Sequence, residues 1–219
     1  MVGAGADRSV RIVVAWLVCA VVCTGLAVAD ESESLPDARS FVSIQAGYAE
    51  AHGDFEGGPL FRCIGGFMLD PADIFLGFRY LRVDNEEDGL ARGRLDLPMY
   101  FIGADISTTI FVFQPYVGVA GALAMPSHRI DSRIAEDLEN EGTRLEEELD
   151  GGFGWIGLAG CRIPLVGRIG IDLGIEYLSF STRVTTTLTD VPLDEIVGRT
   201  EKQIGLSHSI AAAGLWITL

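Results

Sequence analysis

Basic residues are scarce in this chain of 219 residues, with 16 Lys and Arg against 31 Asp and Glu and a formal net charge of −15 at pH 7. A surface of this sign repels the phosphate backbone, so nucleic acid is excluded as a partner. Charged residues make up only 21% of the chain, whereas 48% is hydrophobic and the mean hydropathy is +0.31. The length suffices for one domain with a full core, but this hydropathy is high for a soluble protein.

Long apolar runs are absent except near the N-terminus, where Arg8 and Arg11 precede a largely apolar stretch over residues 12–28. The stretch ends in Ala-Val-Ala, which is typical of a cleaved secretory signal peptide. We therefore expect a signal peptide over 1–29 and a mature domain over 30–219; an uncleaved membrane anchor is the alternative. No later segment reaches the ~18 consecutive apolar residues of a membrane helix. If the mature domain enters a membrane, it must do so as strands.

Helical periodicity is nearly absent from the mature domain, and alternation with period two takes its place. Short connections alternate with long polar ones, as expected for hairpins that cross a membrane with both termini on one side. The predicted fold is all-β, an eight-stranded antiparallel up-and-down transmembrane β-barrel. The eight strands are expected over residues 40–50, 60–69, 74–83, 94–104, 109–123, 153–163, 168–181 and 203–219.

The stretch FQPYVGVAGALA, residues 113–124, indicates which side of a strand faces inward. Its odd positions are mostly bulky, while its even positions are mostly small and include Gln114. Lipid favours large apolar side chains on the outer face of a barrel. The interior of an eight-stranded barrel is so narrow that side chains fill it completely. The small face therefore points inward.

Applied to every strand, this rule predicts a packed, polar interior. Strand four is oriented with Leu95, Leu97, Met99 and Phe101 toward lipid, which turns Asp96 inward. Buried charges require partners, so we expect an ion-paired plug without a wide pore; the alternative places two or more of the charges in water at the barrel ends. The predicted ion-pair network consists of Arg62, Arg79, Arg162, Asp96, Asp172 and Glu176, with Gln45 and Gln114 as further polar groups in the lumen.

Cysteine is rare, since only Cys63 and Cys161 remain in the mature domain. The same rule turns both side chains outward, on strands two and six, at opposite sides of the barrel. A disulfide requires α-carbons within ~7 Å of each other. Two free thiols are therefore predicted.

Residues 128–150 form a strongly acidic connection with nine acidic and three basic residues. Apolar residues at helical spacing within this segment indicate a short amphipathic helix. The segment is interpreted as a solvated surface loop. A site for divalent cations or a partner is the alternative, but the spacing of a calcium-binding loop is missing. No metal and no cofactor are expected.

Together with GWIGLAGCRIPLVGRIGIDLGIEYLSF at 154–180, the stretch FQPYVGVAGALA resembles the small eight-stranded outer-membrane barrels of Gram-negative bacteria, the OmpA/OmpX type. The resemblance implies a monomer in the cell outer membrane, surrounded by outer-membrane lipid and lipopolysaccharide. It also implies that the barrel-assembly machinery reads the C-terminal strand. Leu219 departs from the aromatic residue with which such barrels usually end.

The function expected from this resemblance is a structural or surface-interaction role, with acidic loops outside the cell. One alternative is a narrow channel for small or hydrophobic molecules. Another is a lipid A-modifying enzyme, for which Ser207, His208 and Ser209 are the candidates, although neighbours on a strand point to opposite faces. A third is a soluble lipocalin-like carrier, whose outer face would carry recurring polar residues. We expect no enzymatic activity.

Overall fold

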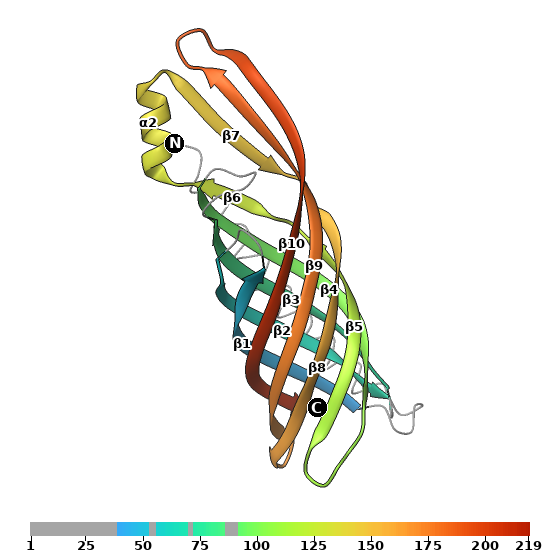
Figure 1. The fold of residues 1–219 in the computed structure, drawn as a ribbon. Coiled ribbons are helices and arrows are strands. Elements are labelled where there is room, and N and C mark those ends of the chain that lie inside the picture. Colours follow the sequence, from blue (N-terminus) through green and yellow to red (C-terminus); the bar gives the residue numbers. More distant parts are fainter. Residues whose placement is uncertain (1–38, 53–55, 70–71, 86–91) are drawn as a thin grey trace.

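The computed structural model describes residues 39–52, 56–69, 72–85 and 92–219 (Figure 1). The predicted signal peptide, 1–29, lies outside these residues. Eight long antiparallel strands follow one another in sequence order, and the ring closes because β1 pairs with both β2 and β10. The strands are β1 (Arg39–His52), β2 (Gly58–Leu69), β3 (Ala72–Asn85), β4 (Gly93–Ser107), β5 (Gln114–Ala124), β8 (Gly152–Val166), β9 (Ile169–Asp190) and β10 (Glu195–Thr218). The predicted all-β, antiparallel arrangement of eight strands is thus confirmed.

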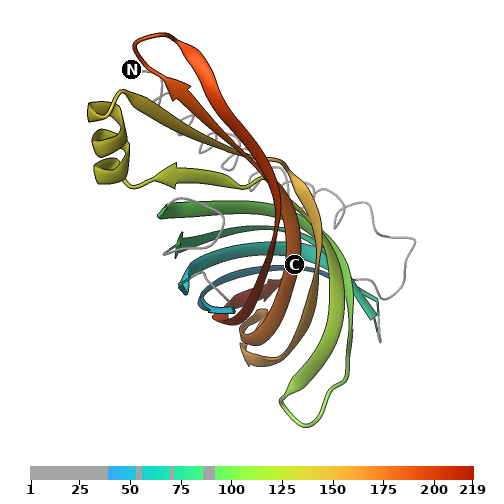
Figure 2. The same ribbon diagram turned by 45° about the horizontal axis from the view of Figure 1, so that its top comes forward.

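The strands are strongly tilted (Figure 2). Following paired residues round the ring from Phe41 leads back to β1 at Ala51, so the ring is staggered by ten residues. With eight strands, this stagger corresponds to a tilt of about 40°. Such a ring is just wide enough for side chains to fill it.

The acidic connection between β5 and β8 has its own structure, with β6 (Ser127–Ile130), α2 (Ser132–Asn140) and β7 (Thr143–Leu149). The expected short helix is therefore confirmed, although it occupies only the middle of the segment. Asp131 caps it by accepting a hydrogen bond from the Arg133 backbone N–H at 3.0 Å. No helix in the described ranges is long and apolar enough to cross a membrane.

The strands β9 and β10 extend well beyond the rest of the ring (Figure 1). They are 22 and 24 residues long, against 11 to 15 for the other six. Beyond the ring, β7 pairs with β9 between Val184 and Asp190. A three-stranded sheet therefore projects from the end of the ring that carries the long connections.

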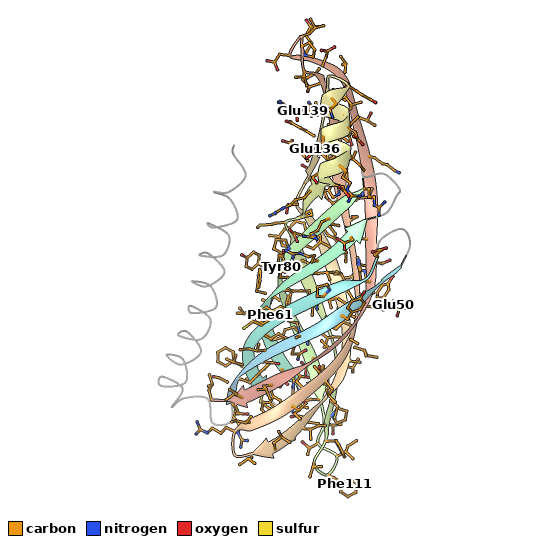
Figure 3. The ribbon with its side chains drawn as sticks, turned by 90° about the vertical axis from the view of Figure 1, so that its left-hand side faces the viewer. Glu50, Phe61, Tyr80, Phe111, Glu136 and Glu139 are labelled. Carbon is orange, nitrogen blue, oxygen red and sulfur yellow. The ribbon has the colours of Figure 1, made fainter. Side chains whose placement is uncertain are left out.

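At the other end, the turn between β4 and β5 lies further along the chain than expected. Backbone hydrogen bonds join Ile110 to Phe113, so the tip falls at Phe111 and Val112, and β5 begins at Gln114 instead of 109. Phe111 has a positive φ of 57° and is 93% exposed. Figure 3 shows it at the end of the molecule opposite to α2.

The predicted orientation of β4 is wrong. Leu95, Leu97 and Met99 are buried inside the ring, at no more than 1% exposure. Leu97 lies directly opposite the equally buried Leu81 of β3, whereas Ile102 on the other face is 64% exposed. The reason is that the interior near the long connections is itself apolar, so bulk no longer marks the outer face of this strand. Asp96 consequently points outward.

Candidate functional site: the closed interior and its rim

Inside the ring, Glu176 on β9 is the centre of a first group of ion pairs. Its carboxylate contacts Arg62 of β2 and Arg79 of β3, and all three side chains are at most 3% exposed. Arg79 also lies over the ring of Phe101, with its guanidinium carbon 5.6 Å from the centroid. One carboxylate thus holds two guanidinium groups from strands on the opposite side of the ring.

A second group is centred on Arg162 of β8. Its guanidinium contacts Asp73 and donates to Asp105 at 2.8 Å, with all three side chains almost fully buried. The guanidinium carbon also lies 4.6 Å from the ring centroid of Tyr116 and 5.1 Å from that of Phe41. Arg162 therefore satisfies two carboxylates and packs on two aromatic rings.

Gln45 connects the two groups. Its Oε1 accepts a hydrogen bond from Arg62, and its Nε2 donates to Asp172 and, at 3.1 Å, to Ser43. Asp172 also accepts hydrogen bonds from the Tyr116 hydroxyl at 2.9 Å and the Ser43 hydroxyl at 3.2 Å. Asp172 is therefore held mainly by neutral donors.

The structure brings most of the predicted network together. Arg62, Arg79, Arg162, Asp172, Glu176 and Gln45 are all buried in the interior. Gln114 lies at its lower edge, half-buried, and donates to Ser107 at 2.9 Å. Asp73 and Asp105 are missing from the predicted network, because both stand next to turn-like sequences. Both residues fall on inward-facing positions of the alternating pattern in β3 and β4. This alternation was the signal that could have identified them.

These contacts close the ring at this level. The cavity left among Phe41, Arg62, Tyr116, Arg162 and Asp172 measures about 10 Å³. A single water molecule needs at least that much room. The interior at this level is thus a packed ion-pair layer.

Asp96, which was expected in this layer, lies instead on the outer face near the rim. It accepts hydrogen bonds from the Tyr80 hydroxyl at 2.6 Å and from Nε of Arg82 at 2.9 Å. Arg82 stands directly opposite it on β3. The side chain is only 7% exposed because these neighbours cover it.

Towards the long connections the interior becomes apolar. The described residues that fill it are almost completely buried; they include Leu60, Leu81, Leu95, Leu97, Met99, Leu178, Phe180, Leu206 and Ile210. His208 is fully buried among them. The interior therefore has a charged layer near the short turns and an apolar layer above it.

The wall of the ring changes where this apolar layer ends. Pairing between β5 and β8 stops at Ala124 and Gly152. Beyond that point β6 pairs with β4 and β7 with β9, but the described residues show no pairing between β6 and β7. His128 and Glu147 connect these two strands through Nδ1 and Oε2, 2.8 Å apart, with side chains almost fully buried.

The outer face carries an apolar belt with a sharp upper border. Exposed fractions reach 66% at Ile175 and 62% at Val117. On β9 the outward apolar residues run from Ile169 to Tyr177, about the length a tilted strand needs to cross a bilayer. Ser179 follows on the same face.

Aromatic residues mark this border on other strands too. Tyr48 on β1 is followed by Glu50, and Tyr80 on β3 by Arg82, each two residues further along the same face. Figure 3 shows Glu50 and Tyr80 on the outside of the ring, with Phe61 from β2. Aromatic side chains at the edges of an apolar belt are typical of membrane barrels.

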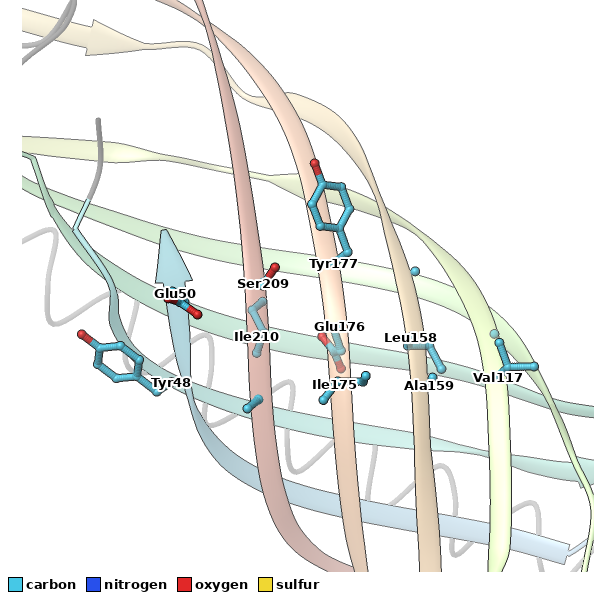
Figure 4. Close-up of a pocket in the computed structure, with 13 residues that line it drawn as sticks. Tyr48, Glu50, Val117, Leu158, Ala159, Ile175, Glu176, Tyr177, Ser209 and Ile210 are labelled. Atoms are coloured by element: carbon cyan, nitrogen blue, oxygen red, sulfur yellow. The ribbon is translucent and has the colours of Figure 1, made fainter. Parts of the chain in front are cut away.

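The belt is hollowed on one side (Figure 4). A groove of about 660 Å³ crosses β9 and β10, and small residues such as Ala159 and Ala211 form its floor. Tyr48 and Tyr177 stand at its edges, and Ser209 lies at the border. The groove belongs to the outer apolar surface.

Ser207, His208 and Ser209 do not form a catalytic arrangement. His208 is fully buried in the interior, whereas Ser207 and Ser209 line hollows on the outer face. Within the described ranges, no three His, Cys, Asp or Glu side chains are placed to hold a metal ion. Cys63 and Cys161 are free thiols, as predicted.

Solved structures with the same arrangement of strands identify the fold. The outer membrane protein OprG from Pseudomonas aeruginosa matches with a TM-score of 0.64 and 11% identity, over 83% of this chain and 96% of that one. The fold is that of a small outer-membrane β-barrel. Neisserial surface protein A matches with a TM-score of 0.53 and 14% identity, over 83% of this chain and 98% of that one.

The outer membrane protein AlkL, solved in lipid bilayers, matches this barrel with a TM-score of 0.52 and 13% identity, over 84% of this chain and 90% of that one. The sequence matches no protein-family model, and a search of curated proteins finds no match. The likeness is therefore one of fold.

Proposed function

We propose that this chain is an outer-membrane barrel with a structural or surface-interaction role. The observation that carries the proposal is the contrast between its two faces: an exposed apolar belt outside and a packed ion-pair layer inside. Such a belt is stable only in lipid, and a layer closed to about 10 Å³ does not serve as an aqueous pore. The acidic connections would then lie outside the cell.

Several sequence-based expectations belong to this proposal. They are the cleaved signal peptide over 1–29, the OmpA/OmpX-type resemblance, the monomeric state, the surrounding outer-membrane lipid and lipopolysaccharide, and assembly through the C-terminal strand. The strand supports the last of these, because its residues from Ser207 to Thr218 pair with β1 and it presents Leu215 and Ile217 to the outside.

A soluble carrier fits the surface poorly. In a lipocalin-like protein the outer face meets water, yet here Ile102, Val117 and Ile175 are each more than 60% exposed. Contiguous apolar surface of this kind marks contact with lipid or another protein. An enzyme also finds no support in the separated positions of His208 and its two serine neighbours.

A narrow conduit for hydrophobic molecules is the second candidate. The apolar upper interior favours it, and so does the missing pairing between β6 and β7 in the described residues. Together these features would outline a lateral path from the mouth of the ring into the membrane. The pair His128–Glu147 lies across this path. In vesicles that carry the protein in their membrane, the Glu147→Gln variant should take up an apolar dye faster than the native protein. The Arg144→Gln variant should take it up at the native rate.

Cell fractionation and electrophoresis test the first proposal. The protein should be found in the outer membrane and should migrate faster before boiling than after it, as closed barrels do. In planar bilayers the purified barrel should show no ion conductance. Recovery in a soluble fraction would contradict the membrane assignment, and stable conductance steps would contradict the closed interior.

A further inference from the structure

The outer face of β9 and β10 changes from apolar to hydroxyl-bearing at one level. Tyr177 is the last outward residue of the apolar belt on β9, and Ser179 and Ser181 follow it on the same face. On β10, Ser209 stands directly opposite Tyr177 in the register. Ser207, the next outward residue, stands opposite Ser179. The upper border of the belt therefore crosses both strands at this level.

Two hollows meet at this border, and Tyr177 lines both of them. The lower hollow is the groove of about 660 Å³ in the apolar belt. The upper hollow measures about 400 Å³ and extends from Phe153 on β8 to Ser207 on β10. Figure 4 shows the ring of Tyr177 pointing away from Ile175 along β9, with its hydroxyl group outermost. A single molecule that passes Tyr177 would occupy both hollows.

The lower groove has the shape of a furrow for a hydrocarbon chain. In the register, Ala211 of β10 lies between Tyr48 of β1 and Ile175 of β9. Likewise, Ala159 of β8 lies between Ile175 and Val117 of β5. Neighbouring strands are about 4.8 Å apart, so the large side chains on either side of each alanine stand about 10 Å apart. This spacing leaves room for one acyl chain above the alanine.

The upper hollow combines aromatic rings with neutral hydroxyl groups. Trp155 stands opposite Ser179, and its ring centroid lies 5.5 Å from that of Tyr177. Ser179, Ser181 and Ser207 supply hydroxyl groups, which both donate and accept hydrogen bonds. Among the residues that the structure describes, no charged side chain lines this hollow. In a chain with a net charge of −15, such a neutral surface favours a ligand without charge.

Phe153 indicates what kind of neutral ligand the upper hollow fits. It lies two residues beyond Trp155 on β8, above the border, and is 80% exposed. Trp and Tyr suit a membrane border because each combines an apolar ring with a polar group, whereas Phe has no polar group. A sugar ring has apolar C–H groups on its faces and hydroxyl groups at its edge. It can therefore cover the Phe153 ring and hydrogen-bond to the serines at the same time.

We propose that the outer face of β8, β9 and β10 binds a glycolipid of the outer leaflet. One acyl chain occupies the lower groove, and a neutral sugar ring stacks on the aromatic rings and hydrogen-bonds to Ser179 and Ser207. A phosphate headgroup fits less well, because the carboxylate of Glu50 stands opposite Ser209 at the border and repels anions. The proposal rests on the membrane location given under Proposed function.

The test uses dodecyl maltoside as the probe, because it carries one apolar chain and a neutral sugar head. The barrel is held in phospholipid nanodiscs, and the probe is kept below the concentration that dissolves them. Binding is followed by the fluorescence of Trp155, since Trp216 is buried in the interior at 6% exposure. Dodecylphosphocholine, with the same chain and a charged head, should bind at least about tenfold more weakly, and so should maltose.

Two variants test the two hollows separately. Ala211→Leu fills the lower groove and Phe153→Ala removes the upper ring, so each should weaken dodecyl maltoside binding about tenfold. The matched controls are Ala104→Leu and Phe61→Ala, which make the same changes at exposed outer positions of β4 and β2. Both controls should bind as the native protein does. The fast-migrating band before boiling shows that each variant is folded.

Equal binding by the site variants and their controls would overturn the proposal, and so would equal binding of dodecyl maltoside and dodecylphosphocholine. Maltose binding as strong as that of dodecyl maltoside would assign the upper hollow to a soluble glycan instead. Cell fractionation keeps the two proposals apart. A protein that is absent from the outer membrane but binds dodecyl maltoside selectively contradicts the proposed function alone. Unselective binding by a protein found in the outer membrane contradicts the glycolipid site alone.

Discussion

Arg162 on β8 donates to Asp105 on β4 at 2.8 Å, although β5 lies between these strands in the ring. The contact therefore crosses the interior and does not follow the sheet. Together with the contact to Asp73 on β3, it joins β8 to the paired strands β3 and β4, neither of which is a neighbour of β8 in the sheet. The charged layer thus braces the ring from within.

Replacing Arg162→Met should strongly destabilise the barrel, because it leaves Asp73 and Asp105 buried without their cation. Removal of one partner from a buried ion pair costs about 3–5 kcal/mol. Urea unfolding followed by loss of the fast-migrating band measures the effect. Arg168→Met, at an exposed turn position, is the control and should leave the midpoint unchanged; equal midpoints for the two variants would contradict a bracing role for Arg162.

Gly160 provides a test of interior packing. A Cβ atom at this position would lie against the Tyr116 hydroxyl and the Leu173 carbonyl oxygen. Gly160→Ala should therefore displace Tyr116 from Asp172 and destabilise the fold by about 1–3 kcal/mol. Gly121→Ala has no heavy atom within 4 Å of the new Cβ and should leave stability unchanged. A stable Gly160→Ala barrel would show that the interior is less tightly filled than described.

The orientation of β4 can be tested with single labels. In a background with Cys63→Ser and Cys161→Ser, a fluorophore at Ile102→Cys should be quenched by a lipid-borne quencher, because Ile102 is on the exposed face. A fluorophore at Leu97→Cys should be protected inside the ring. The opposite result would restore the orientation predicted from the sequence.

The thiols can be tested by alkylation and mass spectrometry. Both cysteines should be alkylated after unfolding, since Cys63 and Cys161 are free. In the native barrel Cys161 should react faster, because Cys63 is only 5% exposed. An intramolecular disulfide in the isolated protein would contradict the strand order.

The alternation of side chains identified most of the ring. On β5 the small face of Gly118 and Ala120 is turned inward and the bulky face of Val117 and Val119 is exposed, as predicted. The rule works where the interior is narrow and charged, since only small residues then leave room for arginines. The same parity correctly places Asp172 and Glu176 on the inner face of β9.

The rule fails on β4 for a physical reason. Both faces of this strand are apolar, since Leu95 and Leu97 fill the upper interior while Tyr100 and Ile102 lie on the outer surface. Nothing in the alternation distinguishes them. Likewise, Asp105 stands beside a turn-like sequence, and its role depends on Arg162, 57 residues away in the chain. The contacts of such residues follow from ring closure, which local patterns do not encode.

The projecting ends of β9 and β10 would be precarious as a two-stranded ribbon, because an isolated hairpin is marginally stable in water. β7 supplies a third strand along Val184–Asp190, and it belongs to the acidic segment 128–150. That segment therefore supports the part of β9 and β10 that projects beyond the ring. Shortening the segment 128–150 should bend or shorten the projecting ends of β9 and β10, while the ring below stays intact.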